Sequence, residues 1–166
     1  MLIRDATSDD LPRLLEIYNH YVVHTPISFD IEPVDPANRL DTWFPHYGDS
    51  GRYRLLVATI GDLAIGYASS SRFHMRAAYA TSVETSVYVD KDYLGKGVGT
   101  KLYAALFEAL KGTDVHRAYG GITLPNEASM ALHKRFGFRE IGTYSEVGFK
   151  FERYFDVCWL EKRISR

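Results

Sequence analysis

The sequence predicts an α+β class of fold, an α/β three-layer arrangement in which helices flank a mixed, mostly antiparallel sheet. The first observation is a hairpin: strands are expected at 53–60 and 63–73, and the Gly-Asp pair between them is a tight-turn signal. The second is a later strand–helix–strand unit, whose strands at 83–89 and 115–123 should be a central parallel pair. A length of 166 residues suits a single domain, 1–166, with a sizeable core.

The N-terminal part is expected to form a short strand at 1–6 and then a helix. A weak capping box, formed by a threonine followed three residues later by an aspartate, marks the helix start. The apolar face of this helix is formed by Leu11, Leu14, Leu15, Tyr18, Val22 and Val23. Pro26 ends it, and the proline-rich segment 25–36 that follows contains Phe29, which is expected to be buried. Such a segment either lines a pocket or is a packed connector; a second helix is expected around 38–45.

Glycines are closely spaced where the 83–89 strand gives way to the next helix: Gly95, Gly97 and Gly99. They let the backbone turn sharply and leave N–H groups bare at the positive end of the helix. Such a site binds anions, most often a phosphate. The spacing G-x-G-x-G fits neither the dinucleotide fingerprint nor the Walker loop. A glycine-rich turn without a ligand remains the alternative.

The helix after the glycines and the C-terminal elements follow from similar signals. Apolar residues recur at helical spacing from Val98 to Leu110, and Gly112 marks the end. Asn126 is a good N-cap for a last helix that should end at Gly137. The residues expected to pack inward from this helix are Ala128, Ala131, Leu132 and Phe136. Two final strands are expected at 138–143 and 149–160.

Composition excludes several classes of protein. The formal net charge is −1, so no overall field favours nucleic acid or an anionic membrane. No apolar run approaches the length of a membrane span, and the first residues do not resemble a signal peptide. The single cysteine, Cys158, lies in the apolar run VCWL, which indicates a buried hydrophobe in a reducing cytoplasm. No metal site is expected.

The glycine loop and three further stretches resemble a known family. Leu94 to Gly99 is similar to the pyrophosphate loop [RQ]-x-x-G-x-[GA] of the GNAT acetyltransferases, with leucine at the position where the family prefers Gln or Arg. The whole chain resembles the phosphinothricin and methionine sulfoximine N-acetyltransferases within that superfamily. The stretches that carry this resemblance are IYNHYVVHTPISFDIEPVD at 17–35, RAAYATSVETSVYV at 76–89, and LPNEASMALHKRFGF at 124–138 followed by GFKFERYFDV at 148–157.

The resemblance implies the GNAT fold and acetyl-CoA as co-substrate. The residues implied in binding it are Val87, Tyr88, Val89, Gly95, Lys96, Gly97, Val98, Gly99, Thr100, Asn126 and Ser129. A strand edge can hydrogen-bond the pantetheine amides as if they were another strand. The glycine loop would take the pyrophosphate.

The resemblance also implies catalytic and acceptor-binding residues. Glu84 is the candidate general base, because an α-ammonium is largely protonated at neutral pH and must lose a proton before it attacks. His133 is a candidate catalytic group; its alternative is a packing role beside the cofactor. A backbone N–H near Val87 could stabilise the tetrahedral oxyanion. The implied acceptor-binding residues are Phe29, Phe73, Arg76 and Tyr79, of which the guanidinium and the phenol suit an amino acid with a second anionic or oxidised group.

The expected activity is therefore N-acetylation of a small amino-acid-like amine. Two alternatives stay open: acetylation of protein or peptide N-termini, and a non-enzymatic acyl-CoA sensor. His74 stands where some of the sulfoximine enzymes have an arginine, so the acceptor itself stays undetermined. The apolar, aromatic strands at 147–160 make a homodimer plausible, and neither nucleic acid nor membrane is expected as a partner.

Overall fold

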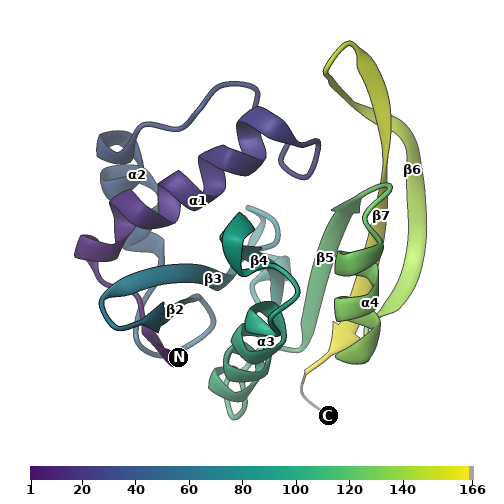
Figure 1. The fold of residues 1–166 in the computed structure, drawn as a ribbon. Helices are drawn as coiled ribbons and strands as arrows, with labels where there is room; N and C mark the ends of the chain where they lie inside the picture. The colour runs from purple at the N-terminus through teal and green to yellow at the C-terminus, as the bar shows by residue number, and fades with distance from the viewer. Residues whose placement is uncertain (165–166) are drawn as a thin grey trace.

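Seven strands form one mixed sheet in the computed structural model, which describes residues 1–164 (Figure 1). The strands are β1 (Leu2–Asp5), β2 (Arg54–Ile60), β3 (Leu63–Arg72), β4 (Ser82–Val89), β5 (Arg117–Thr123), β6 (Arg139–Lys150) and β7 (Arg153–Arg163). Their order across the sheet is β1-β2-β3-β4-β5-β7-β6. Every neighbouring pair is antiparallel except β4 and β5, which are parallel as predicted.

Helices cover both faces of the sheet. The helices are α1 (Leu11–His24), α2 (Pro36–Thr42), α3 (Val98–Ala109) and α4 (Glu127–Arg135). Side chains alternate between the two faces of a strand, and β2 shows the result. Leu55 and Val57 pack in a cluster with α1, whereas Leu56 and Ala58 pack in a second cluster with α3. The three-layer class predicted from sequence is thus confirmed.

The local start and stop signals are borne out. Thr7 and Asp10 form a capping box, although it caps a short 3-10 turn that leads into α1. The side chain of Asn126 accepts a hydrogen bond from the backbone N–H of Ser129 at 3.1 Å, which caps α4. Gly112 and Gly137 have φ angles of 76° and 79° just after α3 and α4. Glycine adopts this left-handed conformation without a steric penalty, so both helices end there.

The parallel pair is short. β4 pairs with β5 at three positions, of which the last joins Glu84 to Tyr119. β4 continues along β3 as far as Val89, and β5 continues along β7 as far as Thr123. Beyond Glu84 the described residues form no ladder between β4 and β5, so the edge of β4 that faces β5 is open. An open edge offers backbone N–H and C=O groups to a ligand.

The expected break in the C-terminal strands is wrong. β6 runs unbroken for 12 residues, from Arg139 to Lys150, instead of ending at 143. The register against β7 shifts between Tyr144 and Gly148, and Glu146 has a φ of 52°. The residues between the two expected strands therefore form an irregularity within β6, and the actual turn, at Phe151 and Glu152, falls inside the strand expected at 149–160. In Figure 1 the resulting β6–β7 hairpin, yellow-green, extends well beyond the neighbouring strands.

Smaller expectations also need correction. The second helix begins at Pro36 rather than at 38 and ends at Thr42, because proline is well suited to the first helical position. Val23 is 45% exposed, so the apolar face of α1 is narrower than expected. Ala128 and Ala131 are exposed rather than packed inward. No helix in the described range is long and apolar enough to cross a bilayer.

Candidate active site

A groove runs between the open edge of β4, the glycine loop and α4. Its volume is about 600 Å³. Most of the residues predicted to bind the cofactor line it: Val87, Tyr88, Val89, Gly95, Gly97, Val98, Gly99, Thr100, Asn126 and Ser129. The structure thus brings together residues that are up to 42 positions apart, from Val87 to Ser129. Ala128 and Ala131 also line the groove, which explains why they are exposed.

The glycine loop is shaped for a ligand at the N-terminus of α3. Gly95 and Gly97 have φ angles of 72° and 76°, and Gly97 is the N-cap of the helix. A Cβ atom at either position would meet no heavy atom within 4 Å, so space is open beside the bare backbone. Lys96 turns away instead: its Nζ donates to the carbonyl oxygen of Asp92 at 2.8 Å. The backbone of the loop, not the lysine charge, is what faces the groove.

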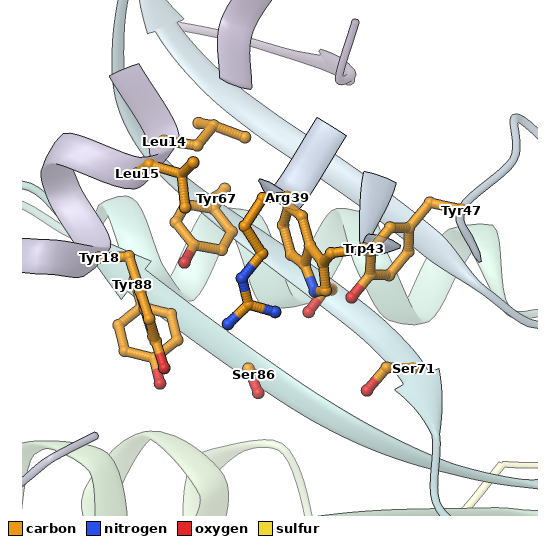
Figure 2. Close-up of a pocket in the computed structure, with 11 residues that line it drawn as sticks. Leu14, Leu15, Tyr18, Arg39, Trp43, Tyr47, Tyr67, Ser71, Ser86 and Tyr88 are labelled. Atoms are coloured by element: carbon orange, nitrogen blue, oxygen red, sulfur yellow. The ribbon is translucent and has the colours of Figure 1, made fainter. Parts of the chain in front are cut away.

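A second, smaller cavity lies on the α1 face of the sheet (Figure 2). Its volume is about 140 Å³, which is room for several water molecules or a short side chain. The residues that line it are Leu14, Leu15, Tyr18, Arg39, Trp43, Tyr47, Tyr67, Ser69, Ser71, Ser86 and Tyr88. We call it the aromatic pocket. Tyr88 lines both the aromatic pocket and the groove, so the two cavities meet at β4.

Glu84 lies on the face of β4 that forms the floor of the aromatic pocket, but it is outside the residues that line the pocket or the groove. It precedes Ser86 and Tyr88 at the two-residue spacing that places side chains on one face of a strand. In the sheet it pairs with Ser71 of β3, which lines the pocket, and with Tyr119 of β5. The side chain is half-buried, and burial raises the pKa of its carboxyl group. The carboxylate is therefore a stronger base than an exposed glutamate, and it lies on the strand that borders both cavities.

His133 is buried in the core beneath the groove. A carbonyl oxygen can only accept a hydrogen bond, so Nδ1 donates to the oxygen of Ser129 at 2.8 Å and carries the proton. Nε2 accepts from the hydroxyl of Tyr103 at 3.0 Å. Burial lowers the pKa of this imidazole, which favours the neutral ring. A Cβ at Gly120 would lie 2.7 Å from Nε2, so the ring fills the space that glycine leaves. His133 is outside the set of residues that line the groove.

The four residues predicted to bind the acceptor are not brought together in one cavity. Phe73 stacks on Tyr119 with the two ring centres 4.3 Å apart. The ring centre of Phe73 is also 6.1 Å from the ring centre of Tyr79. Because Tyr119 pairs with Glu84, this aromatic group flanks the carboxylate on the side opposite the aromatic pocket. Arg76 is exposed and, like Phe73 and Tyr79, lies in the connection between β3 and β4. None of the four lines the aromatic pocket.

Phe29 lies across the site from the β3–β4 connection. It is 38% exposed, so the expectation of a buried ring is wrong. Its ring packs directly on the Cα of Gly148 in β6, where it takes the space that a Cβ would need. Beside it, buried Lys150 donates from Nζ to the carbonyl oxygen of Ser28 at 2.7 Å. The segment 25–36 is thus held against the β6–β7 hairpin.

Sequence reasoning missed most of the aromatic pocket. The sequence places Tyr18 on the apolar face of the first helix and Arg39 and Trp43 in a second helix with no predicted role in the site. One signal was available: the strand 63–73 carries three consecutive serines in a run that is otherwise apolar. A buried strand keeps polar side chains where they meet a partner or a ligand.

Comparison with known proteins gives consistent matches over nearly the whole chain. The family description "Acetyltransferase (GNAT) domain" matches residues 3–159. A phosphinothricin N-acetyltransferase of Streptomyces coelicolor is 52% identical over 96% of this chain and 94% of its own length. An L-methionine sulfoximine/L-methionine sulfone acetyltransferase of Pseudomonas paraeruginosa is 37% identical over 96% of this chain and 92% of its own length. An acetyltransferase from Salmonella typhimurium, solved with its cofactor acetyl-CoA, has a TM-score of 0.93 at 33% identity and covers 100% and 95%.

Proposed function

The chain belongs to the GNAT family of acetyl-CoA-dependent N-acetyltransferases, and from that premise we propose that its acceptor is the primary amine of a small amino acid. The acceptor class is of the phosphinothricin or methionine sulfoximine type. The names of two relatives, one at 52% and one at 37% identity, support this class. The observation that carries the proposal is the meeting of two cavities at Tyr88, one groove-shaped and one small, with Glu84 on the same strand.

The groove fits acetyl-CoA. The backbone N–H groups of Gly95 to Thr100 would hold the pyrophosphate at the positive end of α3. The open edge of β4, at Val87 to Val89, would pair with the pantetheine amides. When bound, acetyl-CoA supplies the acetyl thioester. Asn126 and Ser129 would contact the cofactor from α4.

Glu84 is the proposed general base. Its carboxylate takes the proton of the acceptor's ammonium group, directly or through a water molecule, and the neutral amine then attacks the thioester carbonyl. A raised pKa makes the carboxylate better matched to this task, because proton transfer is favoured as the two pKa values approach each other. A backbone N–H near Val87 would bind the oxyanion.

His133 is proposed to position α4 rather than to exchange protons with the substrate. Both ring nitrogens are engaged, one with Ser129 and one with Tyr103. Ser129 lines the groove, so the histidine fixes the backbone of a cofactor-binding turn. This role is the packing alternative stated for His133 from the sequence.

The remaining acceptor contacts are assigned to the β3–β4 connection and to the segment 25–36. Arg76 and Tyr79 would bind the second anionic or oxidised group of the acceptor. Phe73 and Phe29 would provide apolar walls on the two sides of Glu84. Three of the four, Arg76, Tyr79 and Phe29, are exposed and so open to a ligand, whereas Phe73 is half-buried.

A homodimer and a cytoplasmic location complete the proposal. The β6–β7 hairpin presents large exposed side chains, namely Ile141, Tyr144, Val147, Phe149, Phe151 and Tyr154. A cluster of this kind on an extended hairpin fits burial against a second copy of the chain. Cys158 is buried and free, which fits a reducing compartment.

The direct test measures CoA thiol release from acetyl-CoA against a panel of primary amines. The panel contains phosphinothricin, methionine sulfoximine, methionine sulfone, ordinary amino acids and short peptides with free N-termini. The proposal expects the highest kcat/KM for the first three. Faster turnover of peptides would favour the N-terminal alternative, and no turnover of any amine would favour an acyl-CoA sensor.

A further inference from the structure

A guanidinium group stands inside the aromatic pocket. Arg39 lies in α2, and its side chain is 27% exposed. The guanidinium carbon is 5.8 Å from the ring centre of Tyr18 and 5.7 Å from that of Trp43. Figure 2 shows the nitrogens directed away from α2, toward Ser86 on the floor of the pocket. The two rings hold the group in place without using its N–H donors.

Most of these donors lack a protein acceptor. A guanidinium carries five N–H donors. In the described part of the chain, its one hydrogen bond runs from Nη2 to Oδ2 of Asp30 at 3.4 Å, which is long and makes a half-exposed, single-point ion pair. That oxygen already accepts from the hydroxyl of Tyr18 at 2.7 Å. A half-buried arginine with unused donors is completed by a planar anion such as a carboxylate, which it binds through two parallel hydrogen bonds.

An opposite charge lies just beyond the lining of the pocket, two residues before Ser86 on β4 and paired in the sheet with Ser71. Glu84 is on the floor face of β4, whereas Arg39 comes from the α2 wall. Tyr47 also lines the pocket, and burial raises the pKa of its hydroxyl to about 12, so this group stays neutral between the two charges. A positive wall and a negative floor edge match the two charges of an α-amino acid.

We infer that Arg39 binds the α-carboxylate of the acceptor and so makes the enzyme selective for free α-amino acids. This inference rests on the proposed function and adds the group by which the substrate class is recognised. With its carboxylate on Arg39, the acceptor directs its amine toward Glu84 and the open edge of β4. Arg76 then serves the side-chain group rather than the α-carboxylate. A peptide N-terminus has an amide at this position and cannot satisfy the guanidinium.

The test compares methionine sulfone with its α-carboxamide, which keeps the amine and the side chain but lacks the carboxylate. For Arg39→Met, kcat/KM for the acid should fall about 10- to 100-fold, the loss expected for a charge-assisted pair of hydrogen bonds. The value for the carboxamide should stay within about twofold of the wild type. Arg39→Lys keeps the charge without the fork and should recover only part of the loss. As the matched control, Arg76→Met should affect acid and carboxamide equally.

An equal loss for acid and carboxamide in Arg39→Met, or no loss, would overturn the inference. Calorimetric titration of both compounds into CoA-loaded protein gives the same comparison without turnover. A wild type that acetylates neither compound would therefore overturn the proposed function, while a selective loss of acid binding in Arg39→Met would still support the role of Arg39. Thermal melting of each variant shows whether it is folded. If Arg39→Met does not fold, the acid and the carboxamide are compared in Arg39→Lys instead.

Discussion

At the scale of single residues, Glu84 combines a position on the strand that borders both cavities with a carboxyl group whose pKa is raised by burial. Glu84→Gln keeps the size of the side chain but removes its ability to accept a proton at neutral pH. We expect kcat to fall by roughly 10²–10⁴, with acetyl-CoA affinity near that of the wild type. The wild-type kcat should decline on the acidic side at a pH above the ordinary glutamate pKa of about 4.3, because the base must be ionised.

The pH dependence separates a base from a structural carboxylate. As pH rises, more of the amine is already neutral and needs no base, so the ratio of wild-type to Glu84→Gln kcat should shrink. The measurement is the kcat of both proteins across the pH range in which the enzyme stays folded. A ratio that is constant with pH, or a lower melting temperature that accounts for the whole loss, would reject the role of Glu84.

Gly120 is a second single-residue determinant, and it acts on stability. An added Cβ would lie 2.7 Å from Nε2 of His133. This ring cannot move without breaking its hydrogen bonds to Tyr103 and Ser129. Gly120→Ala should therefore lower the free energy of unfolding by about 1–3 kcal/mol, as expected for overpacking, measured by urea denaturation.

Gly142 offers the matched control for this substitution. It lies in β6, and a Cβ added there meets no heavy atom within 4 Å. Gly142→Ala should change the free energy of unfolding by less than about 0.5 kcal/mol. Equal effects of the two substitutions would show that the contact with His133 is not what requires glycine at 120.

At the scale of elements, the strand β4, the glycine loop and α3 form one unit that is proposed to hold the cofactor. Gly97→Asp introduces a side chain and a negative charge where the phosphates should lie. Binding of acetyl-CoA, measured by calorimetry, should be abolished, because the charge opposes an anion at the helix N-terminus. Unchanged affinity would rule out the loop as the phosphate site.

Gly112 provides a control for the backbone strain that a non-glycine residue causes at Gly97. Gly112, just beyond the other end of α3, also has a φ of 76° and open space beside its Cα. Gly112→Asp imposes a similar strain on the left-handed conformation but lies outside the residues that line the groove. It should reduce thermal stability as Gly97→Asp does while leaving acetyl-CoA affinity unchanged.

At the scale of the whole molecule, the β6–β7 hairpin determines the proposed association state. Phe149 and Tyr154 face each other across the hairpin with ring centres 4.9 Å apart, and both are more than half exposed. Phe149→Asp places a charge in the proposed interface, and burial of an unpaired charge is costly. The molar mass of Phe149→Asp, measured by light scattering coupled to size-exclusion chromatography, should therefore be that of a monomer, whereas the wild type should be a dimer.

The control for this substitution is Leu63→Asp at the start of β3. Leu63 is a large apolar residue, 45% exposed, and lies outside the hairpin. It should leave the dimer intact. A monomeric wild type at micromolar concentration, or a Phe149→Asp protein that still dimerises, would contradict the assignment of the interface.

The sequence by itself determined the features that depend on local chemistry. Asn126 caps its helix through its own side chain, and Gly112 and Gly137 end helices because they tolerate positive φ. The hairpin turn predicted an antiparallel pair, and the strand–helix–strand unit predicted the parallel pair of β4 and β5. The glycine loop predicted an anion site because a phosphate cradle is made of consecutive backbone groups, which are contiguous in sequence.

Only the tertiary structure decided what depends on distant segments. The aromatic pocket brings together α1, α2, β3 and β4, and nothing local to Arg39 indicates that its guanidinium points into a cavity. Ala128 and Ala131 have the spacing of a buried face but line a groove, because β5 and β4 separate beyond Glu84. His133 carries the sequence pattern of a catalytic residue, yet its neighbours engage both of its nitrogens in the core. Packing across the sheet sets the environment of each side chain. A local sequence pattern does not show which distant residues form that environment.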